Sequence, residues 1–207
     1  VDAAAASTWI KIVADIEGNV IITQKEGVDL IIDGSANSYD GTFFIHGQAR
    51  SNGAETLEFR NINFKHAGSE LNFIESNSTG SVERYAHNVT VDGCTFKNVA
   101  AEPVDDKEYT TGTEIMNCTF YGDGMTGANY AGSFVDIAGN DVNVHGNIGY
   151  RNGNTNIVAA FELHEQVEGW GYHCIFTDNT VYMDQPYGAV DTSRRMYVVD
   201  GWYSDFS

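Results

Sequence analysis

The chain has 207 residues, of which 42% are apolar, and its 11 basic and 29 acidic side chains give a formal net charge of −18. A surface this acidic repels phosphate backbones and anionic lipid headgroups, so we expect neither nucleic acid nor a membrane as a partner. The charge also disfavours a polyanionic sugar, unless a cation such as Ca²⁺ bridges the like charges.

Residues 1–18 precede the first clear repeat. Their one stretch compatible with a helix is short, around Ala3–Ser7, and we expect it to cap the N-terminal end. After residue 8 no stretch sustains the i, i+3, i+4 apolar spacing of a helix. We therefore divide the chain into a cap segment, 1–18, and a β domain, 19–207. The sequence stops within a repeat, so we expect further chain or another subunit, as in a homotrimer, to cover that end.

A four-residue sequence motif recurs five times: Gly or Asn, then a small or apolar residue, then any residue, then an aromatic residue. With two weaker copies, its first residues lie 22 to 32 residues apart, a period typical of a solenoid. Gly and Asn tolerate the left-handed backbone of a sharp corner between strands. The predicted corners are Gly34, Asn61, Gly93, Asn117, Asn147, Asn179 and Gly201.

The residues before these corners, as in "LEFRN", "VTVDG" and "VNVHG", alternate apolar and polar in the period of a strand. The aromatic residue after each corner should then point inward. Stacked coil upon coil, these rings would form a column with a spacing of about 4.8 Å. The predicted column consists of Phe64, Phe96, Phe120, Tyr150 and Tyr182.

A third strand per coil is indicated after a variable loop. The stretch Glu102–Gly112 lacks a clear copy, so we expect a looped excursion there. Three short strands per coil predict an all-β, single-stranded, right-handed parallel β-helix of about seven coils. The candidate third strands are Phe43–His46, Leu71–Ser76, Ser133–Gly139, Val158–His164 and Gly188–Asp191.

The stretches "VDLIIDGSANSYDGTFFIHG", "AETLEFRNINF" and "AHNVTVDGCTF" resemble the pectin-lyase-like superfamily of right-handed parallel β-helices, especially the repeats of large surface and phage-associated proteins. The resemblance runs from Asn19 to the end of the chain. It implies the fold but leaves the function open, because the superfamily contains polysaccharide lyases, glycoside hydrolases, adhesins and phage tailspikes. The Gly-His-Gly and acidic pairs of its hydrolases are missing, and the motifs of its lyases do not match position by position.

Outward side chains of the third strands should form a column along one face of the solenoid. Carboxylates about 5 Å apart suit a retaining glycosidase and a wider separation an inverting one, and crowding raises a carboxyl pKa as a general acid requires. We therefore predict Asp136, Glu162 and Asp191 as catalytic residues. His46, Glu75 and His164, the last an alternative to Glu162 in register, are predicted to bind substrate in the same column.

Two further segments suit sugar binding. In Glu162–His173 the rings of Trp170 and Tyr172 lie among carboxylates, although Trp170 has the alternative of packing on the coil below. In Asp184–Arg195 the side chains of Tyr187 and Arg194 suit a uronate, although an Arg–Asp pair that offsets local charge is the explanation we favour for the arginine. Neither segment carries a metal-binding motif, so we expect no metal or other cofactor, with calcium alone left open by the resemblance.

Two functions fit these features. Our main prediction is an extracellular or virion-surface β-helix that serves as a structural or adhesive module engaging glycans, as in a bacterial adhesin or a phage tail or capsid appendage. The alternative is a polysaccharide-degrading enzyme, a glycoside hydrolase or lyase, that uses the carboxylate column. Both functions place the protein outside the cytoplasm and make a polysaccharide or cell-surface glycan its partner.

Overall fold

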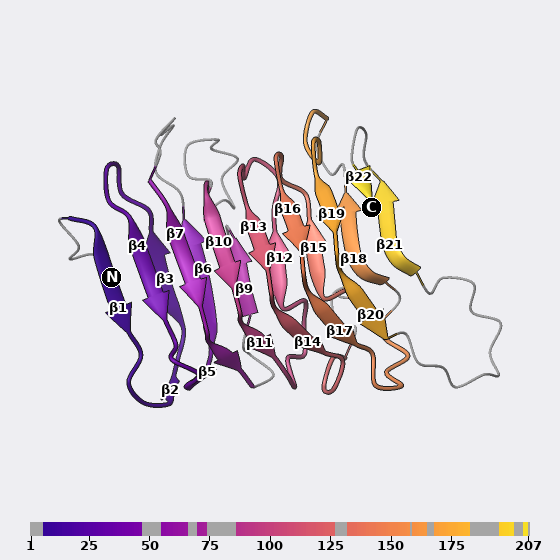
Figure 1. The fold of residues 1–207 in the computed structure, drawn as a ribbon, viewed down its shortest axis with the longest axis horizontal. Helices are drawn as coiled ribbons and strands as arrows, with labels where there is room; N and C mark the ends of the chain where they lie inside the picture. The colour runs from indigo at the N-terminus through magenta and orange to yellow at the C-terminus, as the bar shows by residue number, and fades with distance from the viewer. Residues whose placement is uncertain are drawn as a thin grey trace.

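In the computed structural model the chain winds into a β-solenoid whose strands stack side by side along the long axis (Figure 1). The structure describes residues 6–46, 55–65, 70–73, 86–126, 132–157, 159–164, 168–182, 195–200 and 205–206. No helix occurs in these residues, and therefore none that is long and apolar enough to cross a membrane.

The strands form three parallel sheets, and each coil contributes one strand to each sheet. The first sheet contains β1 (Thr8–Lys11), β4 (Leu30–Asp33), β7 (Leu57–Arg60), β10 (Val89–Asp92), β13 (Glu114–Met116), β16 (Asn143–His145), β19 (Ile175–Thr177) and β22 (Asp205–Phe206). The second contains β2 (Ile16–Glu17), β5 (Ser38–Asp40), β8 (Asn63–Phe64), β11 (Thr95–Phe96), β14 (Thr119–Tyr121), β17 (Ile148–Tyr150) and β20 (Thr180–Tyr182). The third contains β3 (Val20–Thr23), β6 (Thr42–His46), β9 (Glu70–Phe73), β12 (Val104–Asp106), β15 (Val135–Ile137), β18 (Ala159–His164) and β21 (Arg195–Asp200).

The predicted all-β parallel β-helix is confirmed, with local corrections. The stretch Glu102–Gly112, predicted to be a looped excursion, contains β12 in the third sheet. Residues 195–200 form β21 of the third sheet, whose strand the pattern places at Gly188–Asp191, outside the described residues. β1 and β2 already join the first and second sheets within residues 8–17, while the boundary at residue 18 and the helix around Ala3–Ser7 stay predictions.

Left-handed residues mark the corners between the first and second sheets. Such a backbone is costly for most side chains and tolerable for Gly, Asn and Asp. Three of the predicted corners are observed, but two others fall one residue earlier than the predicted Asn147 and Asn179. The predicted corner at Gly34 falls later, at Ser35 and Ala36, with φ 48° and 62°, and Gly201 lies outside the described residues. The other observed corners, with φ between 53° and 65°, are Asn61, Gly93, Asn117, Gly146 and Asp178.

The aromatic column inside the solenoid is shorter than the sequence predicts. Phe64, Phe96 and Phe120 are fully buried and stack nearly parallel, with ring centroids 4.6 and 5.1 Å apart. Tyr150 and Tyr182 were predicted to continue this column, and that prediction is wrong. Their rings stack on each other in a separate outer row, and Tyr182 is 55% exposed.

The early corner at Gly146 explains this break. The earlier corner shifts the inward and outward positions of the following strand by one residue. Gly149 rather than Tyr150 therefore lies opposite Phe120, and Val181 lies opposite Gly149 in the next coil. Gly149 has no side chain to fill the column, and Phe134 occupies the space instead. The ring of Phe134 stacks on Phe120 at 5.6 Å, and a Cβ atom built at Gly149 would lie 2.8 Å from it.

The displaced asparagines form a buried hydrogen-bond ladder. Asn147 is fully buried, its Nδ2 donates to Ile115 O at 2.9 Å, and its Oδ1 accepts from the Cys118 N–H at 2.9 Å. Asn179 Oδ1 accepts from both the backbone N–H and Nδ2 of Asn147, and its own Nδ2 donates to Val144 O. These bonds satisfy buried polar groups and fix the register between coils.

Candidate active site

The third sheet gathers one carboxylate from each of three successive coils. Asp105 on β12, Asp136 on β15 and Glu162 on β18 occupy the same position in adjacent parallel strands, which lie about 4.8 Å apart. The row faces away from the core, because the flanking Val135 and Ile137 are fully buried inside the solenoid. The three acidic residues are only 8% exposed, so bulk water screens their charges weakly.

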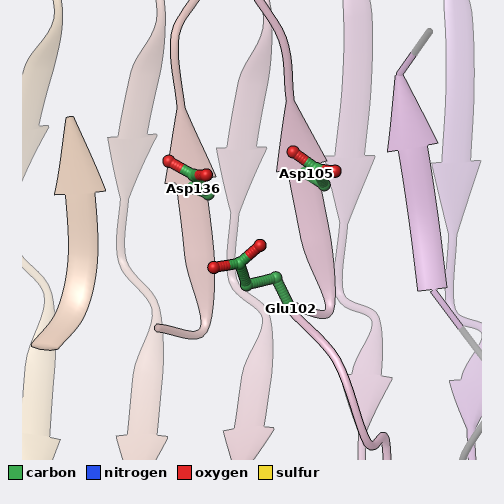
Figure 2. A group of neighbouring side chains, drawn as sticks. All are labelled: Glu102, Asp105 and Asp136. Carbon is green, nitrogen blue, oxygen red and sulfur yellow. The ribbon is translucent and has the colours of Figure 1, made fainter. Parts of the chain in front are cut away.

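Glu102 and Lys107 complete the cluster from either side of β12. Figure 2 shows the Glu102 carboxylate reaching from the segment before β12 towards Asp105 and Asp136. One carboxylate oxygen from each of these three residues lies within 4.8 Å of the other two. Lys107 follows β12 directly, and its Nζ lies 2.5 Å from Asp105 Oδ1. We call these four residues, together with Glu162, the acidic cluster.

Burial and like charge both act on Glu102. Burial raises the pKa of its carboxyl group most, and the charges of Asp136 and Asp105 raise it further, to about 8. The Lys107 ammonium opposes this rise in part, and Glu162 adds to it. Glu102 is therefore protonated at neutral pH, and it exchanges a proton in the pH range where many enzymes work.

Lys107 is the positive group of the acidic cluster. Burial acts to lower the pKa of its ammonium group, but the attraction of Asp105, followed by Asp136 and Glu102, outweighs burial and raises the pKa. Lys107 is therefore charged at neutral pH. Its position beside three carboxyl groups combines an acid, a base and a positive charge within one small region, as general acid–base chemistry requires.

The chemistry of the donors suits a hard cation. Carboxylate oxygens are the preferred ligands of Ca²⁺, and Glu102, Asp105 and Asp136 place three of them close together at a site that already carries excess negative charge. These three residues would hold such a cation.

Asp106, the residue between Asp105 and Lys107, points into the solenoid and is fully buried. Its carboxyl group lies 2.7 Å from the Thr110 hydroxyl and accepts hydrogen bonds from the Thr113 hydroxyl, at 2.9 Å, and the Gly139 N–H, at 3.2 Å. Burial raises its pKa to about 7, against the effect of these hydrogen bonds. Asp106 thus anchors the turn that follows β12 and with it the backbone at Lys107.

Of the predicted catalytic residues, the structure brings Asp136 and Glu162 together. In the register of the sheet Val198, not Asp191, follows Glu162, and Asn72 precedes Asp105. Asp191 and three predicted binding residues lie outside the described residues: Glu75, Tyr187 and Arg194.

The predicted histidines lie on two strands of the same sheet. His46 is on β6 and pairs with Thr23, whereas His164 is on β18 and pairs with Asp200. Both positions are therefore two residues along their strands from the carboxylate row, and their side chains lie outside the described part of the structure. Glu162, rather than His164, is the residue in register with Asp136.

Trp170 and Tyr172 lie in the turn between β18 and β19, at the edge of the third sheet. The ring of Trp170 packs edge-on against Tyr109 with centroids 5.0 Å apart, and the N–H of Tyr172 donates to Asn140 Oδ1 at 2.8 Å. Both side chains are half-buried. Trp170 thus packs on a residue two coils away, since Tyr109 follows β12 and Trp170 follows β18, rather than on the adjacent coil as the alternative expected. Contact with sugar stays a prediction for both rings.

Sequence reasoning missed Glu102, Asp105 and Lys107. All three belong to the stretch that the pattern assigns to a loop, because Asp106 stands at an inward position where strands of this chain carry apolar residues. The segment "PVDDKE" does contain a strand signal. Val104 fits an inward position and Lys107 an outward one, provided that Asp106 is accepted as a buried inward acid.

No protein-family model and no curated protein sequence matches the chain. Among solved structures, the chain is similar to the crystal structure of alginate lyase from Paenibacillus sp. str. FPU-7, with 31% sequence identity and a TM-score of 0.69. The match covers 92% of this chain and 66% of the lyase chain. This chain thus spans just under two thirds of the length of that lyase.

This similarity corrects the functional prediction. The main prediction of a structural or adhesive module was wrong, because the similar structure is that of a polysaccharide-degrading enzyme. The similarity favours the alternative, an enzyme acting on a polysaccharide, and within it the lyase class. The features of adhesins and phage appendages that the repeats suggested find no support, whereas the parallel β-helix itself is confirmed.

Proposed function

We propose that this protein is a polysaccharide lyase that cleaves alginate or a chemically related polyuronate by β-elimination. The similarity to an alginate lyase over 92% of the chain carries the proposal, since an identity of 31% extends beyond a shared fold. The acidic cluster supports it independently, because it provides groups for proton transfer on an outer face of the solenoid.

β-Elimination at a uronate has three requirements. The carboxylate of the sugar must be neutralised, the proton on C5 must be removed, and the leaving O4 must receive a proton while the C4–C5 double bond forms. A cation held by Glu102, Asp105 and Asp136 would offset the charge of the uronate and of these carboxylates. It would also resolve the repulsion between an acidic protein and an acidic polymer.

Lys107, which carries its proton at neutral pH, is the proposed donor of the proton that the leaving O4 receives. Its Nζ lies at the edge of the three carboxyl groups, where a uronate bound to them would place its ring. In the protein alone the carboxylates raise the pKa of Lys107. A cation held by these carboxylates would offset their charge and lower the pKa of Lys107 again. Asp105 holds the ammonium group through its ion pair with Lys107 Nζ, and the charge of Asp136 attracts it as well.

The direct test is incubation of the protein with alginate, polygalacturonate and a neutral glucan, with and without added calcium. A lyase produces both new reducing ends and the ultraviolet absorbance of a C4–C5 double bond. Reducing ends without that absorbance would identify a hydrolase, the other enzyme class left open by the sequence. Absence of cleavage of every acidic polymer would contradict the proposal.

Two substitutions separate the roles of Lys107. Lys107→Ala removes both the charge and the proton, whereas Lys107→Arg keeps the charge on a group that does not exchange its proton near neutral pH. We expect both variants to lose at least about a hundredfold in kcat, the usual contribution of general acid–base catalysis. Full activity in Lys107→Arg would show that Lys107 contributes charge alone. Lys11→Ala, which removes an exposed lysine on β1, is the matched control.

A further inference from the structure

The second sheet carries an outer row of side chains that is unlike the rest of this acidic surface. After each inward Phe of β8, β11 and β14 comes an outward residue, and in the later coils the same position holds tyrosine. The row consists of Lys65, Lys97, Tyr121, Tyr150 and Tyr182.

The register of the sheet establishes this row. Tyr121 pairs with Tyr150, and Tyr150 with Tyr182, in adjacent parallel strands. The Lys97 N–H donates to Phe64 O, which continues the same register to the two lysines. Lys97 Nζ lies 5.3 Å from the centre of the Tyr121 ring, within the range of a cation–π contact.

The tyrosine rings stack on one another along the row. Tyr121 and Tyr150 stack at 5.2 Å with an interplanar angle of 13°, and Tyr150 and Tyr182 at 5.0 Å with 4°. Because each ring has at least one face against a neighbouring ring, the phenolic hydroxyls repeat at the spacing of the coils. Each hydroxyl is both a hydrogen-bond donor and an acceptor.

Charge distinguishes this row from its surroundings. The whole chain has only five lysines, and two of them, both exposed, are neighbours here. The adjacent outer row of the same sheet contains no carboxylate from β11 to β20: its members are Thr95, Thr119, Ile148 and Thr180. At the N-terminal end the character of this face changes: Asp15, Glu17 and Asp40 lie around and beyond Lys65, so the proposed row ends there.

We propose that this row binds a linear acidic polysaccharide that runs across the strands, at a site separate from the acidic cluster on the third sheet. The ammonium groups of the lysines pair with uronate carboxylates, and the tyrosine hydroxyls donate hydrogen bonds to the following sugars. An extended chain of 1,4-linked pyranoses advances per sugar by a distance of the same order as one coil. The choice of a polyuronate rests on the proposed lyase function.

Such a site holds a long substrate on the enzyme while a different part of the chain is cleaved. It contributes through several weak contacts along one polymer, so its effect grows with polymer length and vanishes for short oligosaccharides. Because its ion pairs are exposed, its effect also decreases as salt rises.

The test compares alginate polymer with short alginate oligosaccharides as substrates for two variants. Lys65→Ala/Lys97→Ala removes the charges, and Tyr121→Phe/Tyr150→Phe/Tyr182→Phe removes the hydroxyls while keeping the stacked rings. We expect the KM for polymer to rise about tenfold in the first variant and about threefold in the second, with kcat/KM for short oligosaccharides unchanged. Lys11→Ala, on the first sheet, should leave both substrates unaffected.

Three results would overturn the inference: an unchanged KM for polymer, an equal loss on short oligosaccharides, or an equal effect of Lys11→Ala. If the wild type does not cleave alginate, the proposed function fails by itself. The same variants are then compared by calorimetry for binding of intact alginate. A wild type that does not bind the polymer, or variants that bind it equally well, would exclude the site on the second sheet.

Discussion

The substitution Glu102→Gln should make the protein more stable at alkaline pH. Protonated glutamic acid and glutamine have nearly the same shape, so the change retains packing and removes only the ability to ionise. In the folded protein the pKa of Glu102 is about 8, against 4.5 in an unfolded chain. The folded protein therefore binds this proton more tightly, and the contribution of Glu102 to stability is lost as pH rises from about 4.5 to about 8.

The size of the effect follows from the same two pKa values. Their difference corresponds to about 5 kcal/mol, reached only above pH 8 and only if the site relaxes little on ionisation. Glu102 is half-buried, so water entering the site reduces this figure. We expect Glu102→Gln to exceed the wild type in free energy of unfolding by about 2–4 kcal/mol at pH 9, and to equal it within about 0.5 kcal/mol at pH 5.

Urea denaturation between pH 5 and pH 9, in the presence of a chelator, measures this difference. Glu17→Gln removes an exposed glutamate on β2 and controls for the change in net charge. A difference between Glu102→Gln and the wild type that does not vary with pH would refute the repulsion among Glu102, Asp105 and Asp136. Added calcium should stabilise the wild type more than the variant, because it binds the folded carboxylates.

Three further substitutions test the core. Gly149→Ala should lower the free energy of unfolding by about 1–3 kcal/mol, since its Cβ would meet the Phe134 ring, and by less in a Phe134→Leu background; thermal melts of the four proteins give this coupling. Asn147→Ala should cost about 2–4 kcal/mol in urea denaturation, because it leaves buried backbone groups without partners. Asp106 has a raised pKa of about 7, so wild-type stability should fall from pH 4 to pH 7, and Asp106→Asn should flatten that fall; a wild-type-like slope would contradict it.

The fold could be predicted because every coil repeats the same pattern of strands, corners and inward side chains. Alternating strands, Gly or Asn at corners and inward aromatics identify a solenoid without reference to any one coil. The register within a coil was harder, because "HGNI" and "TDNT" each offer two residues that accept a left-handed backbone. The sequence pattern favoured Asn147 and Asn179, whereas the chain turns at Gly146 and Asp178 and buries the asparagines as a hydrogen-bond ladder.

The site could be predicted only in part, for the same reason. Asp136 and Glu162 lie on strands with clear apolar flanks, so their outward position follows from alternation. Asp105 and Lys107 flank the buried Asp106, whose hydrogen bonds come from residues distant along the turn and are invisible in the local sequence. Glu102 lies outside any strand, and its approach to Asp136 depends on how the segment before β12 folds back.

A parallel β-helix accounts for both the strength and the cost of this site. Stacking places like residues over like, which favours the Phe column and the asparagine ladder but forces Asp105, Asp136 and Glu162 into one poorly screened row. Their repulsion lowers stability, and an ordinary structural coil would avoid it with threonine or asparagine, as the outer row of the second sheet does. Binding of a cation or a charged substrate would offset this repulsion. We therefore expect catalysis at the coils whose carboxylates destabilise the free protein.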